Sequence, residues 1–377
     1  MKSRIRAGKP TRTTVGNDSS TSVTRHAGLD AEDASPHPRQ RWSRYSGSMP
    51  YVYLVTGGAG FIGSHLTDAL LARGDRVIAL DALSTGRLEN IESAAAHPNF
   101  RFVQGSVLDE MMVDELVHES DLVVHLAAAV GVKLIVERPL HSFTTNIRGS
   151  EIVIEAAHRY RRKTLVVSTS EIYGKNDRGP LKETDDRILG TPSVARWAYS
   201  TAKAVDEILA NVYHRERGLP TFVVRLFNTV GPRQSPAYGM VIPRLVRQAV
   251  NGEPLTVFGD GRQTRCFCHV LDVVDALLQL LDEDRSVGET FNVGTNEEIS
   301  VLELANRIVG LTESLSPIEL IPYEQAWEPG FEDMQRRVPD TTKLRALTGW
   351  APVRSLDDIL RETIAEATAE RAAPARP

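Results

Sequence analysis

Apolar runs and amphipathic stretches alternate along the chain from residue 51 onward. Several runs have the length and apolar content of buried parallel strands: 51–55, 76–80, 101–104, 121–127, 164–168 and 221–226. The segments between them that repeat apolar residues at helical spacing are 66–73, 140–161 and 196–217. This alternation predicts an α/β fold in which helices cover both faces of a doubly wound parallel sheet. The ligand crevice of such a sheet lies at the carboxyl ends of its strands.

The alternation becomes less regular after residue 230. Turn sequences rich in Gly and Pro appear there, and helical spacing returns over 241–250, 271–281 and 301–311. We therefore expect a first domain over 49–230 and a smaller C-terminal α/β lobe, which binds the substrate, over 231–365. Segments such as 265–293 can return to the first domain. Residues 366–377, rich in Ala and Pro, are expected to form a flexible tail.

The first 48 residues differ in composition from the rest of the chain. Basic residues outnumber acidic ones, and Ser, Thr, Pro and Gly supply most of the remainder. Such a segment has too little apolar surface to offset the entropy lost on ordering, so we expect residues 1–48 to form a disordered basic extension. The segment lacks the apolar core of a secretory signal. Met49, two residues before the first strand, favours a mis-called start over a transit peptide.

The composition of the whole chain excludes several classes of protein. No apolar stretch approaches the roughly 20 residues of a membrane span, so no membrane partner is expected. A formal net charge of −5 argues against nucleic acid as the main partner. Cys266 and Cys268 are the two cysteines of the chain, and they do not form a disulfide framework or a zinc site. We expect reduced thiols, no metal and a cytoplasmic location.

A glycine-rich turn follows the first predicted strand. Gly57, Gly60 and Gly63 lead into an amphipathic run over 65–72. Glycines at these positions let a pyrophosphate approach the backbone, and the N–H groups that begin a helix bind its negative charge. The second strand ends at Asp81, where such folds place the carboxylate that binds the adenosine ribose. This order of elements predicts a Rossmann-type domain that binds NAD, since the acid disfavours the 2′-phosphate of NADP.

Two further motifs supply groups for proton transfer. Tyr199 and Lys203 lie four residues apart in a predicted helix and therefore share one of its faces. A lysine ammonium near a phenol lowers the tyrosine pKa from about 10, so the phenolate can take a proton from a sugar hydroxyl. Ser168-Thr-Ser-Glu-Ile-Tyr-Gly174 follows the end of an apolar strand. In that segment Thr169 is placed to hydrogen-bond the hydroxyl, and Glu171 adds a carboxylate.

Together, these motifs resemble those of the extended short-chain dehydrogenase/reductase superfamily. Within it, the chain is similar to the nucleotide-sugar epimerases, dehydratases and decarboxylases over about residues 52–360. Three further segments fit the same template: His125-Leu-Ala-Ala128, Thr145-Asn146 and Arg225-Leu-Phe-Asn228-x-x-Gly-Pro-Arg233. The family usually has an aspartate in place of Ser106, and this departure affects the expected contact with adenine.

The resemblance implies a set of binding residues. The cofactor NAD would contact Gly57, Gly60, Phe61, Ile62, Gly63, Asp81, Ser106, Val107, Ala127, Tyr199 and Lys203. A UDP-sugar would contact Asn228 and Arg233 near its phosphates, Val257 and Phe258 near its base, and Arg265 near the diphosphate or the C5–C6 region of the sugar. The family also forms homodimers through a four-helix contact, here built from the helices around 145–161 and 196–217.

The shared chemistry of the family is transient oxidation at C4 of the sugar, and several outcomes remain open. Thr169, Ser170, Glu171, Tyr199, Lys203 and Arg265 are the expected catalytic residues. The order of these residues resembles the UDP-glucuronate decarboxylases. Arg196-Trp-Ala-Tyr-Ser200 and the later segment Gly330-Phe-Glu-Asp333…Arg337-x-Pro339-Asp340 resemble them too. The segment 129–135 resembles the 4-epimerases instead. A 4,6-dehydratase usually has an acid in place of Ser170, and a non-catalytic sensor usually lacks the Tyr/Lys pair.

Overall fold

The computed structural model describes residues 50–130, 139–194, 196–235, 240–326 and 334–372. The basic extension expected over residues 1–48 lies outside these ranges. Most of the segment that resembles the epimerases, residues 131–135, also lies outside them, as do residues 330–333 of the later segment that resembles the decarboxylases.

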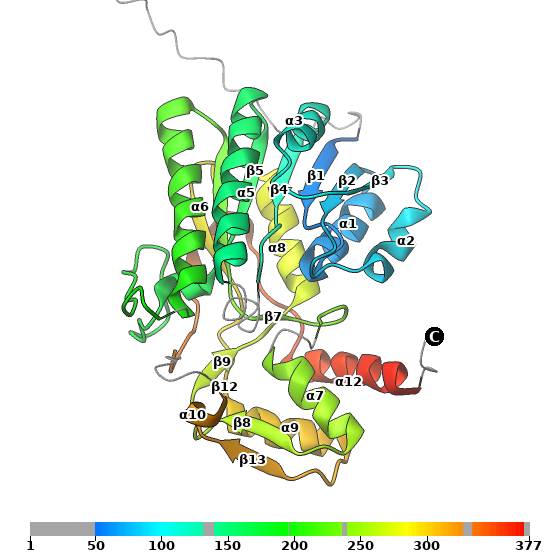
Figure 1. The fold of residues 1–377 in the computed structure, drawn as a ribbon, viewed down its shortest axis with the longest axis vertical. Coiled ribbons are helices and arrows are strands. Elements are labelled where there is room, and N and C mark those ends of the chain that lie inside the picture. The colour runs from blue at the N-terminus through cyan, green and yellow to red at the C-terminus, as the bar shows by residue number, and fades with distance from the viewer. Residues whose placement is uncertain (1–49, 131–138, 195, 236–239, 327–333, 373–377) are drawn as a thin grey trace, which may run out of the picture. The chain divides into compact units, whose positions relative to one another are not determined.

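A parallel sheet of seven strands forms the centre of the structure (Figure 1). Its strands follow the order β11-β6-β5-β4-β1-β2-β3, and every neighbouring pair is parallel. The strands are β1 (Val52–Thr56), β2 (Arg76–Asp81), β3 (Phe100–Gln104), β4 (Leu122–His125), β5 (Lys163–Thr169), β6 (Thr221–Leu226) and β11 (Thr290–Val293). The order of β3 to β6 is that of a Rossmann fold, which confirms the predicted fold class.

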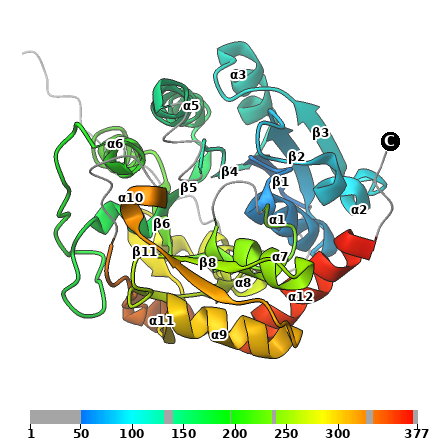
Figure 2. The ribbon, with the colours of Figure 1, turned by 60° about the horizontal axis from the view of Figure 1, so that its bottom comes forward.

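Helices cover both faces of this sheet, as Figure 2 shows. One face packs against α1 (Phe61–Ala72), α8 (Val270–Asp282) and α11 (Thr342–Thr348). The other packs against α3 (Glu110–Glu119), α5 (Pro139–Arg159) and α6 (Arg196–Arg217). Because side chains alternate along a strand, Tyr53 and Val55 enter the first core and Leu54 enters the second. Because both faces of the strands are buried, their sequences are continuous apolar runs and do not alternate between apolar and polar residues.

Some element boundaries differ from those expected. Helix α1 begins at Phe61, directly after the glycine turn, and not at residue 66. Helix α3 was absent from the sequence prediction. Strand β4 ends at His125 rather than at residue 127. Leu126 and Ala127 follow the end of this strand and line a cavity beside it.

A second core lies outside the main sheet. It joins α7 (Val241–Asn251), β8 (Leu255–Phe258), α9 (Val301–Thr312) and α12 (Leu356–Ala372). Short elements complete this part and the loops: η1 (Leu88–Ile91), α2 (Glu92–Ala95), η2 (Ser170–Tyr173), β7 (Thr229–Val230), β9 (Thr264–Cys266), β10 (Cys268–His269), η4 (Asp284–Ser286), β12 (Glu298–Ser300), β13 (Ile318–Ile321) and α10 (Tyr323–Ala326). Although a flexible tail is expected from residue 366, α12 remains helical to Ala372, since Ile359 and Leu360 anchor it in this core.

Among the described residues, no helix is long and apolar enough to cross a membrane. The same ranges contain no group of three or more His, Cys, Asp or Glu side chains that could hold a metal ion.

Candidate active site

The glycine turn between β1 and α1 is too crowded for side chains. Gly57 has a φ of +74°, and its N–H donates to the carbonyl of Leu80 at 2.7 Å. A Cβ on Gly57 would lie 2.9 Å from the backbone nitrogen of Ala127. A Cβ on Gly63 would lie only 2.1 Å from the carbonyl oxygen of Gly57. The turn therefore packs backbone against backbone, which leaves the N–H groups that begin α1 facing the cavity.

Asp81 closes the same turn from the end of β2. Its carboxylate accepts hydrogen bonds from the N–H of Ala59 at 3.0 Å and from the N–H of Leu83 at 2.8 Å. Burial raises the pKa of Asp81, and these backbone donors oppose the rise. The carboxylate is thus held at the cavity wall by the loop that would receive the adenosine ribose.

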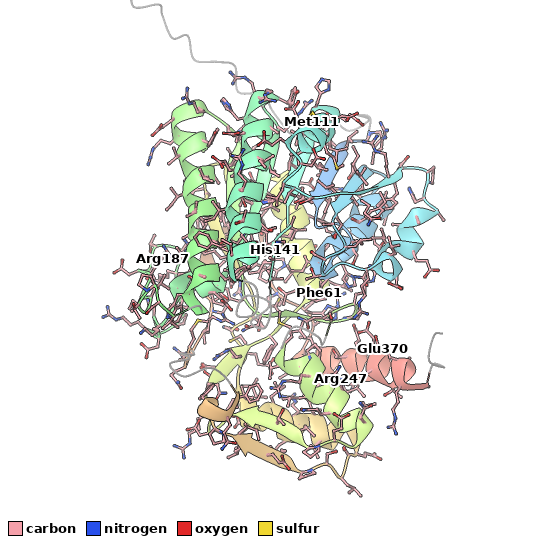
Figure 3. The ribbon with its side chains drawn as sticks, viewed as in Figure 1. Phe61, Met111, His141, Arg187, Arg247 and Glu370 are labelled. Atoms are coloured by element: carbon pink, nitrogen blue, oxygen red, sulfur yellow. The ribbon has the colours of Figure 1, made fainter. Side chains whose placement is uncertain are left out.

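A cavity of about 450 Å³ opens at the carboxyl ends of the strands. This volume is within the range of small-molecule sites. Figure 3 labels Phe61 and His141, two lining residues at the ends of α1 and α5 nearest the second core. The predicted site residues that line it are Gly57, Gly60, Phe61, Ile62, Gly63, Asp81, Ser106, Val107, Ala127, Thr169, Ser170, Glu171, Tyr199, Lys203, Asn228 and Arg233.

Strand β5 and helix α6 bring the groups expected to transfer protons to one wall. Thr169 is the last residue of β5, and its hydroxyl accepts a hydrogen bond from the N–H of Glu171 at 3.2 Å. Tyr199 and Lys203 line the cavity from α6. The ammonium of Lys203 lies 2.7 Å from the carboxylate of Asp206. The cavity wall at the carboxyl end of β5 therefore carries a hydroxyl, a phenol, an ammonium and a carboxylate, which belong to Thr169, Tyr199, Lys203 and Glu171.

Arg337 is a cation of this wall to which the sequence analysis gave no role. Its guanidinium donates to the side-chain oxygen of Asn228 and lies 3.7 Å from the carboxylate of Glu171. Asn228 in turn donates to the carbonyl of Cys266 at 2.8 Å. The segment of Arg337 reaches the site because it pairs with Leu181, whose N–H donates to the carbonyl of Val338 at 2.8 Å.

Three predicted substrate residues are not among the described residues that line the cavity. Val257 is fully buried in the second core. The ring of Phe258 lies beneath the guanidinium of Arg244, whose carbon is 4.3 Å from the ring centroid. Arg265 is largely buried on β9 and donates to the carbonyl of Thr264 at 2.8 Å.

Several buried polar atoms at the cavity lack partners among the described residues. They are the hydroxyls of Thr145 and Thr229, Nη1 of Arg233 and Oε1 of Gln234. Unpaired buried polar atoms are costly, so their presence at one cavity indicates a polar ligand. Together with the glycine turn and Asp81, these groups are of the kind that a dinucleotide and a polar substrate would need. No local sequence signal pointed to Gln234 or Thr229.

A buried histidine fixes the strand ends beneath the cavity. Hydrogen bonds join the imidazole of His125 to the hydroxyls of Thr56 and Ser150 at 2.8 and 3.0 Å. Complete burial lowers the pKa of His125 to about 3, so the ring is neutral. The N–H of Ala127 also donates to the Thr56 hydroxyl at 3.2 Å. This network confirms that His125 is a structural core residue.

A second buried network holds the end of β5. Glu207 accepts from the Ser168 hydroxyl at 2.5 Å and from Arg225 at 2.9 and 2.7 Å. Arg225 also donates to the hydroxyl of Tyr173 at 2.9 Å. Burial raises the pKa of Tyr173 to about 12. Because Ser168 precedes Thr169, the network fixes the strand from which the cavity wall is built.

Comparison with known proteins places the chain in a family. Residues 54–363 match the family model described as GDP-mannose 4,6 dehydratase. A UDP-N-acetyl-alpha-D-glucosaminuronate decarboxylase of Bacillus cytotoxicus is 41% identical, over 82% of this chain and 96% of that protein. UDP-glucuronic acid decarboxylase 1 of Danio rerio is 36% identical, over 82% of this chain and 71% of that protein.

A solved structure supports the same relationship. The UDP-glucuronic acid 4-epimerase of Bacillus cereus, in complex with UDP-glucuronic acid and NAD, matches with a TM-score of 0.77 and 29% identity. The match covers 85% of this chain and 99% of the epimerase. The chain therefore belongs to the GDP-mannose 4,6 dehydratase family, whose members are NAD-dependent nucleotide-sugar enzymes of the extended short-chain dehydrogenase/reductase superfamily.

Proposed function

We propose that this protein decarboxylates a UDP-linked hexuronic acid. The observation that carries the proposal is the cavity wall where the hydroxyl of Thr169, the carboxylate of Glu171 and the guanidinium of Arg337 meet. A uronic acid needs a cation beside its carboxylate and a proton donor beside C5, and Arg337 and Glu171 offer these groups. The 41% identity with a decarboxylase over nearly its whole length supports the same reaction.

In this proposal Tyr199 takes the proton of the C4 hydroxyl. The ammonium of Lys203 stabilises the phenolate, and Thr169 hydrogen-bonds the same hydroxyl. NAD held at the glycine turn and Asp81 would supply the acceptor for the hydride of C4 and the donor for its return. The resulting ketone is β to the carboxylate, so the C5–C6 bond breaks, CO₂ leaves, and the electron pair is delocalised over C5, C4 and the ketone oxygen.

Glu171 completes the reaction in the proposal by relaying a proton from solvent to C5. Arg337 lies 3.7 Å from Glu171 in this structure. A substrate carboxylate that binds Arg337 would displace Glu171 from the guanidinium and free it to carry that proton. Return of the hydride to C4, with the proton held by Tyr199, gives a UDP-pentose. Without that return the product is a UDP-4-keto-pentose.

The remaining contacts are proposed from the positions of the lining residues. The turn at Gly57, Gly60 and Gly63 and the carboxylate of Asp81 would hold NAD. Asn228 and Arg233 would contact the diphosphate of the UDP-sugar. The base would lie toward Phe258, outside the cavity as the structure describes it. Arg337 replaces Arg265 as the proposed cation beside the sugar carboxylate.

A UDP-sugar 4-epimerase is the second candidate. The solved UDP-glucuronic acid 4-epimerase of Bacillus cereus has the same fold, and it binds UDP-glucuronic acid, the uronic acid for which the Danio rerio decarboxylase is named. Epimerisation would use Tyr199, Lys203 and Thr169 in the same first step, without loss of C6. A 4,6-dehydratase is disfavoured, because Ser170 is buried where that reaction needs an acid.

The test is incubation of the purified protein with NAD and either UDP-glucuronate or UDP-N-acetylglucosaminuronate. Mass spectrometry should then record a nucleotide sugar that has lost the mass of one CO₂ from one of the two substrates. A Tyr199→Phe protein prepared in the same way is the negative control. An unchanged mass with a new epimer in the proton NMR spectrum would reject decarboxylation in favour of epimerisation.

We also propose a homodimer that forms through α5 and α6. These helices lie side by side on one face of the sheet, and Leu140, Phe143 and Ile208 expose apolar side chains on them. Sedimentation at micromolar concentration should show a dimer, and Ile208→Glu should convert it to a monomer. Leu320→Glu, at an exposed site on β13, is the matched control and should remain dimeric. A monomeric unmutated protein would contradict the proposal.

A cytoplasmic location is proposed from the cysteines. Cys266 and Cys268 are free and buried, and burial raises the pKa of the Cys266 thiol to about 12. Thiols of this kind suit a reducing compartment. Recovery of the tagged protein from a secreted or periplasmic fraction would contradict this location.

A further inference from the structure

Lys203 has an acidic partner behind it, away from the cavity. Asp206 follows Lys203 by three residues on α6, so the two side chains share a face of the helix. The Lys203 ammonium lies 2.7 Å from an oxygen of Asp206, and the side chains are 3% and 0% exposed. Lys203 lines the cavity and Asp206 does not. Among the described residues, Lys203 is thus the cavity-lining side chain that Asp206 contacts.

A gain in folding stability does not by itself explain why a buried ion pair is present here. Removing two charges from water costs several kcal/mol for each ion, and well-packed apolar residues often replace such pairs without loss. Asp206 accepts no hydrogen bond from a backbone or hydroxyl donor among the described residues, and within them its carboxylate pairs with the ammonium of Lys203. A fully buried carboxylate with so little support is costly to keep.

Other charged groups near Lys203 do not provide the same contact. Glu207, the next residue, makes a bidentate pair with Arg225 and accepts from Ser168. His125 is buried and neutral. The ammonium of Lys203 is thus held by Asp206, one turn along the same rigid helix.

We propose that Asp206 is a positioning residue that fixes the ammonium of Lys203 for cofactor binding and proton transfer. This inference rests on the proposed role of Lys203 beside Tyr199. The nicotinamide ring of NAD is cationic, and its arrival next to a buried ammonium would push the lysine away. A carboxylate on the far side of the ammonium opposes that displacement and keeps the lysine side chain in one orientation.

The test is a double-mutant cycle with Asp206→Asn, Lys203→Met and the double variant. Asp206→Asn alone should lower kcat by about tenfold or more, as expected for directly coupled residues. The KM for the nucleotide sugar should stay unchanged, because Asp206 does not line the cavity. In the Lys203→Met background, Asp206→Asn should have no further effect on kcat. Asp275→Asn, at an exposed position on α8, is the matched control and should leave activity unchanged.

The same cycle is measured on NAD affinity, which does not depend on the identity of the sugar. If no nucleotide sugar reacts, the proposed function is rejected. The double-mutant cycle measured on NAD affinity would then still decide whether Asp206 acts through Lys203. Equal losses from Asp206→Asn with and without Lys203, in kcat and in NAD affinity, would overturn the inference. So would a rise in KM together with a lower melting temperature, since that result indicates a structural role alone.

Discussion

Replacing Tyr199 with phenylalanine is expected to lower kcat by about 10²–10⁴-fold, the usual contribution of a positioned general acid–base. The change removes one hydroxyl and keeps the ring, so the packing of α6 and the binding of NAD should stay intact. The loss falls on kcat because Tyr199 lines the cavity beside Thr169 and Lys203, where the C4 proton is transferred. Steady-state kinetics on the substrate identified by mass spectrometry measure the effect.

Tyr213→Phe is the matched control for that variant. Tyr213 lies on the same helix, packs edge-to-face against His158 and does not line the cavity. Its loss of a hydroxyl should leave kcat within about twofold of the unmutated protein, as expected for a residue that makes no contact with the reacting atoms. Full activity of the Tyr199→Phe protein would show that another group transfers the C4 proton.

The sequence predicts six of the seven strands of the main sheet and misses β11, and the six are found because buried strands leave a local pattern. Buried parallel strands are apolar along their whole length, which marks β1, β5 and β6. The residues that follow such strands must lie at one edge of the sheet. That rule alone brings Gly57, Thr169 and Asn228 to a common cavity, as the structure shows.

Arg337 shows where this reasoning ends. It follows no strand of the main sheet, and it reaches the cavity through backbone bonds between Leu181 and the residues that flank Pro339. Contacts between segments so far apart in sequence leave no periodic signal in either segment. The same limit applies to Gln234, whose unpaired oxygen points to a ligand only when the cavity is known.

Arg265 shows what a family motif leaves open. A family motif assigns it a place near the sugar, yet its side chain donates to the neighbouring carbonyl of Thr264, and the cavity wall carries Arg337 instead. A motif gives the residue but not the direction of its side chain. In the structure Arg265 lies on β9, which pairs antiparallel with β12, a pairing that the sequence analysis did not predict.

The glycine turn is the part of the site with the least tolerance for change. A Cβ on Gly63 would lie 2.1 Å from the carbonyl oxygen of Gly57 and 3.0 Å from the Cα of Gly58. These neighbours are backbone atoms, so they cannot rotate away as a side chain would. Relief of the clash requires α1 to move from the end of β1, which would disturb the N–H groups that face the cavity.

We therefore expect Gly63→Ala to weaken NAD binding by at least about a hundredfold and to lower stability by about 1–3 kcal/mol, the usual cost of overpacking. Isothermal titration with NAD and thermal unfolding measure the two effects. Gly310→Ala is the matched control, because no atom lies within 4 Å of the added Cβ on α9. The control should bind NAD normally and gain about 0.5–1 kcal/mol from the helix propensity of alanine. Normal NAD affinity in the Gly63→Ala protein would mean that the cofactor does not depend on this turn.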